Sequence, residues 1–132
     1  MSYTKTDLKI VLKNKQISSS ELEILLKARE ERKIDFVLMD IREIYEYRQS
    51  SIKGVDMLIP TSVIDRKINL FEKLKNRSVI IYCRTGSRTG QLMYVLNKMG
   101  YTNISHLSCG ILGYLGETAE NASMPSCCFD ED

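Results

Sequence analysis

Residues 78–88, which read SVIIYCRTGSR, are the most informative stretch of the chain. After Ser78 the stretch is continuously apolar as far as Tyr82, which is typical of a strand that is covered on both faces in a parallel sheet. Residues 83–88 then hold a cysteine, two arginines and a glycine, and the segment after them has apolar residues at helical spacing. The stretch therefore predicts a buried strand, a tight loop that begins at Cys83, and a helix.

The segments on either side extend this pattern. Residues 36–39 are a second apolar run, which ends at Asp40, and residues 103–107 are a third candidate strand. Strands that alternate with helices over about 100 residues predict an α/β domain with a mainly parallel sheet. A helix is predicted after Ser18, which has capping-box spacing to Glu21, and a second is predicted from Thr61 or Ser62 to Leu74. A third helix is predicted before Gly100, with an apolar face of Leu92, Val95, Leu96 and Met99. A short final helix is predicted over residues 110–116.

Composition excludes several classes of function. The chain of 132 residues has 43% hydrophobic and 27% charged residues, and its net charge of +2 gives no basic field for nucleic acid. No apolar run approaches the ~20 residues of a membrane-spanning helix, and residues 1–16 lack the apolar core of a secretory signal. We therefore expect a cytoplasmic protein that binds neither nucleic acid nor membrane.

Thiol chemistry is the first chemistry to consider, because the chain has four cysteines and a single histidine. A chain of this length without an export signal is not expected to depend on disulfides. The one close pair, Cys127 and Cys128, lacks the spacing of a structural zinc site, so we expect no metal. His106 lies in a predicted strand and is expected to have no catalytic role.

Cys83 combines features that favour a reactive thiolate. It ends a strand of a parallel sheet, where such sheets bind ligands, and it precedes a helix N-terminus, whose N–H groups and dipole stabilise an anion. Gly86 lets the loop curl with N–H groups inward, and Arg84 and Arg88 can each bind an oxyanion. The prediction is an anion-binding ring around a nucleophilic sulfur, with Arg84, Thr85, Gly86 and Ser87 as its loop residues. The alternative is an ordinary buried thiol beside solvated arginines.

The chain resembles a single-domain rhodanese, a thiosulfate or persulfide sulfurtransferase. The resemblance rests on YCRTGSR (82–88), similar to the active-site loop of that family, and on LMDIR (38–42), similar to the Asp-x-Arg that ends an earlier strand. Further matches in order and spacing are Glu46 with IKG (52–54), Ile59-Pro60, Gly100-Tyr101, CGI (109–111) and Tyr114.

The resemblance implies an organisation for the whole chain. It covers about residues 17–117, between an N-terminal extension of residues 1–16 and a C-terminal tail of residues 118–132. It implies three layers, in which helices flank a central, mainly parallel sheet of about five strands. The tail loses periodicity, and we expect it to be a loosely held extension.

The resemblance also implies sulfur transfer by double displacement. Cys83 takes the outer sulfur of thiosulfate or of a persulfide or polysulfide donor, holds it as a persulfide, and passes it to a thiophilic acceptor such as a protein thiol. No metal or organic cofactor is implied. Arg88 either orients an anionic donor with Arg84 or is held by an acidic partner and shapes the loop, while Asp40 and Arg42 brace the domain.

Two other functions stay open at this point. Cysteine-dependent phosphatases and arsenate reductases of related type have five residues between the cysteine and the arginine, whereas this loop has four, which gives a tighter ring. A non-catalytic rhodanese module, used for binding or regulation, often loses the cysteine that this chain keeps.

The chain departs from the family pattern at residues 50–52, which read SSI in place of Gly-His-Ile, at Cys109 in place of a glycine, and at Tyr114 in place of a tryptophan. Cys109 is a candidate resolving thiol: if strands 78–82 and 103–107 are neighbours, as the resembled fold implies, it lies at the rim of the Cys83 loop. It would then take sulfur from Cys83 or form a disulfide with it; the alternative is a small residue tolerated in place of glycine. Cys127 and Cys128 either relay sulfur, form a redox pair or are incidental.

Overall fold

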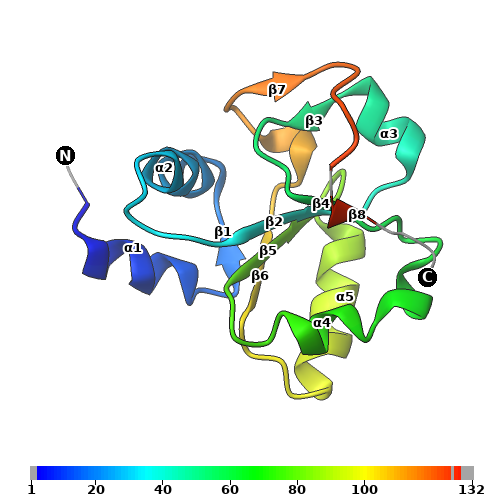
Figure 1. The fold of residues 1–132 in the computed structure, drawn as a ribbon, viewed down its shortest axis with the longest axis horizontal. Coiled ribbons are helices and arrows are strands. Elements are labelled where there is room, and N and C mark those ends of the chain that lie inside the picture. Colours follow the sequence, from blue (N-terminus) through cyan, green and yellow to red (C-terminus); the bar gives the residue numbers. More distant parts are fainter. Residues whose placement is uncertain (1–2, 126, 129–132) are drawn as a thin grey trace.

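Six parallel strands form the central sheet of the computed structural model, which describes residues 3–125 and 127–128 (Figure 1). In spatial order they are β1 (Gln16–Ile17), β6 (Ile104–Leu107), β5 (Val79–Tyr82), β2 (Val37–Asp40), β4 (Met57–Leu58) and β8 (Cys127–Cys128). The longest, β2, β5 and β6, are the three strands that the apolar runs predict. The structure confirms the α/β fold with a parallel sheet flanked by helices, and it adds β8 at one edge.

Helices cover both faces of this sheet (Figure 1). One face carries α1 (Lys5–Leu12) and α2 (Ser19–Glu30), and the other carries α4 (Leu70–Lys73) and α5 (Ser87–Lys98). The remaining elements are α3 (Ile44–Gln49), the 3-10 turns η1 (Ile64–Lys67) and η2 (Ile111–Gly113), and an antiparallel pair of β3 (Ser51–Ile52) and β7 (Thr118–Ala119). Within the described ranges, no helix has both the length and the apolar character that crossing a membrane requires.

The side chains of β5 alternate between the two apolar cores. Val79 and Ile81 lie in the cluster under α4 and α5, whereas Ile80 and Tyr82 lie in the cluster under α1 and α2. All four are fully buried. Cys83 continues the alternation and belongs to the cluster under α4 and α5, so the strand directs its side chain toward the layer that contains α5.

The ends of α2 and α5 agree with the sequence pattern. The Ser18 hydroxyl accepts a hydrogen bond from the Glu21 N–H, and the Glu21 carboxylate accepts one from the Ser18 N–H, which completes a capping box. The helix α5 begins after Gly86 and is followed by Gly100, which has a φ of 95°. A glycine in this left-handed conformation ends the helix as predicted.

The buried face of α5 agrees with the predicted apolar stripe only at Leu92 and Leu96. Thr89, Met93 and Leu96 face the core, whereas Val95 and Met99 are exposed (46% and 49%). Thr89 contacts Cys83 on this buried face. At about 100° per residue, Val95 and Met99 then fall outside the stripe that reaches the sheet.

The single helix predicted over residues 61–74 is wrong, because the structure has η1 and α4 there, with a break between them. The predicted caps are engaged elsewhere. The Thr61 hydroxyl donates to the Ile41 carbonyl, and the Ser62 hydroxyl donates to the Glu43 carboxylate at 2.8 Å. An N-cap side chain must accept from the N–H groups of its own helix, so these hydroxyls tie the segment to the residues after β2 instead.

Both ends of the described chain pack on the domain. Leu8 and Leu12 of α1 are buried in the cluster under α1 and α2. At the other end, β7 pairs with β3, β8 pairs with β4, and the Tyr47 hydroxyl donates to the Ser123 carbonyl at 2.9 Å. The expectation of a loosely held tail is therefore wrong for these residues, because the tail satisfies backbone groups at two strand edges.

Of two other predictions near the C-terminus, one is wrong and the other falls partly outside the described residues. The helix predicted over residues 110–116 is only the three-residue turn η2. Residues 126 and 129–132 of the predicted tail lie outside the described residues.

Candidate active site

The loop of residues 83–88 curls around the Cys83 sulfur at the carboxyl end of β5. The Gly86 N–H donates to Cys83 Sγ, with an N–S distance of 3.2 Å. Gly86 has a φ of 97°, a left-handed conformation that glycine adopts without strain and that turns this N–H inward. Cys83 is fully buried, whereas Arg84, Thr85 and Ser87 are exposed. The loop therefore directs backbone N–H groups toward the sulfur and its polar side chains toward solvent.

The surroundings of Cys83 favour its thiolate form. Burial by itself raises the pKa of the Cys83 thiol, but hydrogen bonds from the N–H groups of Thr89, Gly86 and Arg88, together with the contact of the sulfur with the Thr89 hydroxyl, outweigh it and bring the pKa below its ordinary value. These N–H groups belong to the loop and to the first turn of α5, where N–H groups have no partner within the helix. A thiolate is the nucleophilic form of cysteine.

Arg88 is bound to a carboxylate from a distant element. Its two terminal nitrogens donate to the two carboxylate oxygens of Glu46 on α3, at 3.0 and 3.1 Å. This hydrogen bond is the main cause that lowers the pKa of Glu46 and raises the pKa of Arg88. Of the two roles predicted for Arg88, the geometry fits the one in which an acidic partner holds it and shapes the loop.

Asp40 and Arg42 form a buried ion pair behind the loop. The Arg42 guanidinium donates to both carboxylate oxygens of Asp40, at 2.8–3.2 Å, and to the Ser50 carbonyl at 2.6 Å. It also lies over the Tyr82 ring, 5.5 Å from the ring centre, and the Tyr82 hydroxyl accepts from the Ile52 N–H. Burial lowers the pKa of Arg42, but the hydrogen bond to Asp40 and its charge raise it on balance. The pair connects the ends of β2 and β5 to β3.

A second loop, residues 108–112, supports the Cys83 loop through backbone contacts. The Ile111 N–H donates to the Cys83 carbonyl at 2.9 Å, and the Leu112 N–H donates to the Arg84 carbonyl at 3.0 Å. The two loops approach so closely that a Cβ on Gly86 would lie 2.2 Å from the Ser108 carbonyl oxygen. Glycine is therefore required at this position for packing as well as for its φ.

A cleft of about 300 Å³ opens beside the loop. Arg84, Arg42 and Glu46 contribute charge to its lining, and Ile111 and Leu112 contribute apolar surface. The Arg84 side chain is exposed and makes no hydrogen bond or ion pair with any residue in the described ranges. It is thus a cation available to an anion in the cleft. A larger hollow of about 450 Å³ lies along α2 and includes no residue of the 83–88 loop.

The structure does not bring Cys109 and Cys83 together. Cys83 packs in the apolar cluster under α4 and α5, whereas Cys109 packs against the cluster under α1 and α2, on the other face of the sheet. The Cys109 thiol contacts the Gly110 carbonyl at 3.4 Å. This arrangement favours the alternative in which Cys109 is a small packing residue. Cys127 and Cys128 form β8, and the structure gives only their place in the sheet.

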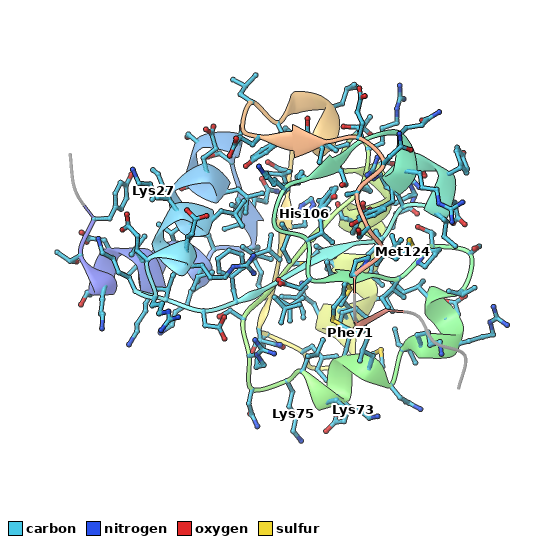
Figure 2. All side chains as sticks on the ribbon, turned by 45° about the horizontal axis from the view of Figure 1, so that its top comes forward. Lys27, Phe71, Lys73, Lys75, His106 and Met124 are labelled. Atoms are coloured by element: carbon cyan, nitrogen blue, oxygen red, sulfur yellow. The ribbon has the colours of Figure 1, made fainter. Side chains whose placement is uncertain are left out.

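Sequence reasoning missed two residues that contact the site. Thr89, in the first turn of α5, places its hydroxyl 3.7 Å from Cys83 Sγ. His106, which lies in the middle of the molecule (Figure 2), places Nδ1 2.7 Å from that hydroxyl. The alternation of β6 beside β5 could have indicated that Ile81 and His106 are neighbours, since the two strands pair at these positions.

Comparison with known proteins agrees with this geometry. The family model of the rhodanese-like domain matches residues 21–117. The thiosulfate sulfurtransferase PspE of Escherichia coli is 31% identical over 68 residues, which are 52% of this chain and 64% of that protein. The "probable adenylyltransferase/sulfurtransferase MoeZ" of Mycobacterium tuberculosis is 31% identical over 77 residues, which are 58% of this chain but only 19% of that protein. The chain thus spans less than two thirds of either relative.

A solved structure shows the same fold. The rhodanese-related protein of Thermoplasma volcanium superposes with a TM-score of 0.63 at 23% identity, and the match covers 80% of this chain and 98% of that one. The family match spans most of the chain and includes the loop around Cys83, the ion pair behind it and the loop that supports it. This chain belongs to the rhodanese-like domain family.

Proposed function

We propose that this protein is a sulfurtransferase that moves sulfane sulfur from thiosulfate, a persulfide or a polysulfide to a thiophilic acceptor through a persulfide on Cys83. The observation that carries the proposal is the environment of the Cys83 sulfur, which accepts a hydrogen bond from the Gly86 N–H in a loop that lowers its pKa. A thiolate held in this way is both a nucleophile and, in the second step, a good leaving group.

The reaction consists of two displacements at sulfur. In the first, the Cys83 thiolate attacks the outer sulfur of thiosulfate, the bond between the two sulfur atoms of the donor breaks, and its electron pair leaves with sulfite. In the second, the acceptor attacks the outer sulfur of the Cys83 persulfide and the electron pair returns to Cys83 as thiolate. The enzyme ends in its starting state, so the cycle needs no external oxidant or reductant.

The two arginines of the loop have different roles in this proposal. Arg84 is exposed on the cleft and orients an anionic donor. Arg88 is occupied by Glu46 and keeps the loop in shape. The persulfide's outer sulfur is stabilised by loop N–H groups, as developing charge is in other preorganised sites.

Two features favour sulfur transfer over the alternatives. The loop has four residues between Cys83 and Arg88, and its contact with the Ser108 carbonyl leaves it little freedom to widen around a tetrahedral phosphate or arsenate. The chain also keeps the cysteine, both arginines and a cleft beside them. A module used only for binding has no need of a thiol with a lowered pKa.

Steady-state transfer of sulfur from thiosulfate to cyanide tests the proposal. The parent chain should form thiocyanate, Cys83→Ser should form none while keeping the fold, and the matched control Cys109→Ser should keep activity. Substantial activity in Cys83→Ser would overturn the assignment. Parallel assays with a polysulfide donor and with a thiol acceptor then define the substrate class.

A further inference from the structure

A row of three buried side chains begins at Cys83 and leads away from the loop. The Thr89 hydroxyl oxygen lies 3.7 Å from Cys83 Sγ and 2.7 Å from Nδ1 of His106. The exposed fractions of the three residues are 0%, 0% and 9%. They come from three different elements, namely the end of β5, the first turn of α5, and β6. These side chains are shielded from bulk solvent, so the direction of each hydrogen bond matters to the thiol.

The Thr89 hydroxyl has one hydrogen and three neighbours that can accept it. These are Cys83 Sγ, His106 Nδ1 and the Gly86 carbonyl, which lies 3.2 Å away. If Nδ1 carries no proton, the short contact with His106 must use the hydroxyl hydrogen, and none is left for the sulfur. If Nδ1 carries a proton, His106 donates to the hydroxyl oxygen, and the hydroxyl hydrogen is shared only between the Gly86 carbonyl and the sulfur, which attracts it more strongly when the sulfur is charged. The tautomer of His106 therefore decides whether Thr89 stabilises the thiolate.

We propose that His106 carries its proton on Nδ1, and that Thr89 and His106 act as a positioning pair which stabilises the Cys83 thiolate. The part of this inference that concerns catalysis rests on the proposed sulfurtransferase function. Burial lowers the pKa of His106, so the imidazole is neutral near pH 7 and the pair works as a chain of dipoles. The hydrogen bond goes to the inner sulfur, the atom that is charged before the first displacement and again after the second.

The positioning pair acts apart from the charges around the site. Those charges are Arg88, which is paired with Glu46, the exposed Arg84, and the buried pair of Asp40 and Arg42. Because Thr89 and His106 leave these charges unchanged, their substitution changes the pKa of Cys83 without changing how an anionic donor is attracted. The expected kinetic signature is a lower kcat at neutral pH with little change in KM for thiosulfate.

The direct test uses the imidazole nitrogen NMR signals of isotope-labelled parent protein at neutral pH. His106 is the only histidine in the chain, so these signals need no assignment. The proposal predicts the tautomer with the proton on Nδ1. The tautomer with the proton on Nε2 would overturn it. This measurement uses no variant and does not depend on sulfur transfer.

Variants test the link to the thiol through the pH dependence of Cys83 alkylation by iodoacetamide. Thr89→Val keeps the shape but removes the hydroxyl, and it should raise the pKa of Cys83 by about one unit, which is a tenfold fall in thiolate well below the pKa. Thr89→Ser should restore most of the effect. An unchanged pKa in Thr89→Val would overturn the proposal.

His106→Phe gives a result whose sign discriminates between the two tautomers. If His106 donates to Thr89, its removal raises the pKa of Cys83; if His106 accepts from Thr89, its removal frees the hydroxyl and lowers that pKa. A lowered or unchanged pKa therefore contradicts the proposal. The matched control is Ser105→Ala on the same strand, which removes a buried hydroxyl bound to the Leu12 and Asn14 carbonyls and should leave the pKa unchanged. If the variants change the pKa of Cys83 as predicted but the parent protein transfers no sulfur, only the proposed function is contradicted.

Discussion

Arg88 and Glu46 are 42 residues apart in the chain, and they form a two-bond ion pair that joins the first turn of α5 to α3. The side chains are 32% and 12% exposed, so the pair is partly shielded from solvent. It occupies the terminal nitrogens of Arg88 that an anionic donor would otherwise meet. Arg84, which makes no such pair within the described ranges, is left as the cation that faces the cleft.

The two arginines should therefore respond differently to the charge of the donor. We expect Arg84→Ala to reduce kcat/KM for thiosulfate about tenfold and to affect a neutral persulfide donor much less, because one charge-assisted hydrogen bond to the anion is lost. Arg88→Ala should reduce the use of both donors equally, because it loosens the loop. Steady-state kinetics with the two donors measure this, and a loss specific to thiosulfate in Arg88→Ala would show that Arg88 binds the donor.

The Glu46–Arg88 pair should also make stability depend on pH in a defined window. The pKa of Glu46 is lowered in the folded state, so its stabilisation is fully present above the unfolded pKa, about 4.3, and is lost as pH falls through the lower folded pKa. Glu46→Gln should cost about 1 kcal/mol at neutral pH. Urea unfolding at several pH values should show this difference shrinking only in acid. A difference that stays constant into strong acid would contradict the role of the pair.

Substitution of Gly86 and of Gly90 by alanine should have opposite effects on stability. A Cβ on Gly86 would meet the Ser108 carbonyl at 2.2 Å, and the left-handed φ of 97° alone costs an alanine about 1–2 kcal/mol. Gly90 lies inside α5 with no atom within 4 Å of its would-be Cβ, so Gly90→Ala should stabilise by about 0.5–1 kcal/mol. Thermal unfolding and sulfur-transfer assays of both variants check this. Equal effects of the two substitutions would mean that the loop tolerates a side chain at Gly86.

The buried Asp40–Arg42 pair predicts a large cost for removing one partner. Arg42→Met leaves the fully buried Asp40 carboxylate without its cation and should lower the free energy of unfolding by about 3 kcal/mol or more. The control is Arg48→Met on α3, an exposed arginine whose loss should change stability by less than about 0.5 kcal/mol. A cost below about 1 kcal/mol for Arg42→Met would show that Asp40 is not held as a carboxylate by this pair.

Features that depend on adjacent residues could be predicted from the sequence, whereas features that depend on residues far apart in the chain could not. The strand and loop of residues 78–88 depend on the residue types of one continuous segment, so their form and the position of Cys83 could be predicted. The partner of Arg88 could not, because Glu46 approaches only through the fold. Thr61 and Ser62 had the chemistry of helix caps, but their hydroxyls bind residues near positions 41–43. Local residue type therefore identified the candidate active-site loop but not the side chains that hold it.

The same limit applies to Cys109. Its place in the sequence suggested a position at the rim of the Cys83 loop, and the loops of residues 83–88 and 108–112 do contact one another. The direction of the side chain, however, depends on the turn after β6, and the turn directs this thiol toward the cluster under α1 and α2. Contact between the two loops therefore does not bring the side chains of Cys83 and Cys109 into contact.

A persulfide on Cys83 would be detected by mass spectrometry of the intact protein after treatment with thiosulfate. We expect a gain of one sulfur atom per chain, located on the peptide that contains Cys83 and released as thiocyanate by cyanide. The Cys83→Ser variant should gain nothing. An unmodified parent chain, or a sulfur atom found on Cys109 while Cys83 stays free, would show that Cys83 does not carry the transferred sulfur.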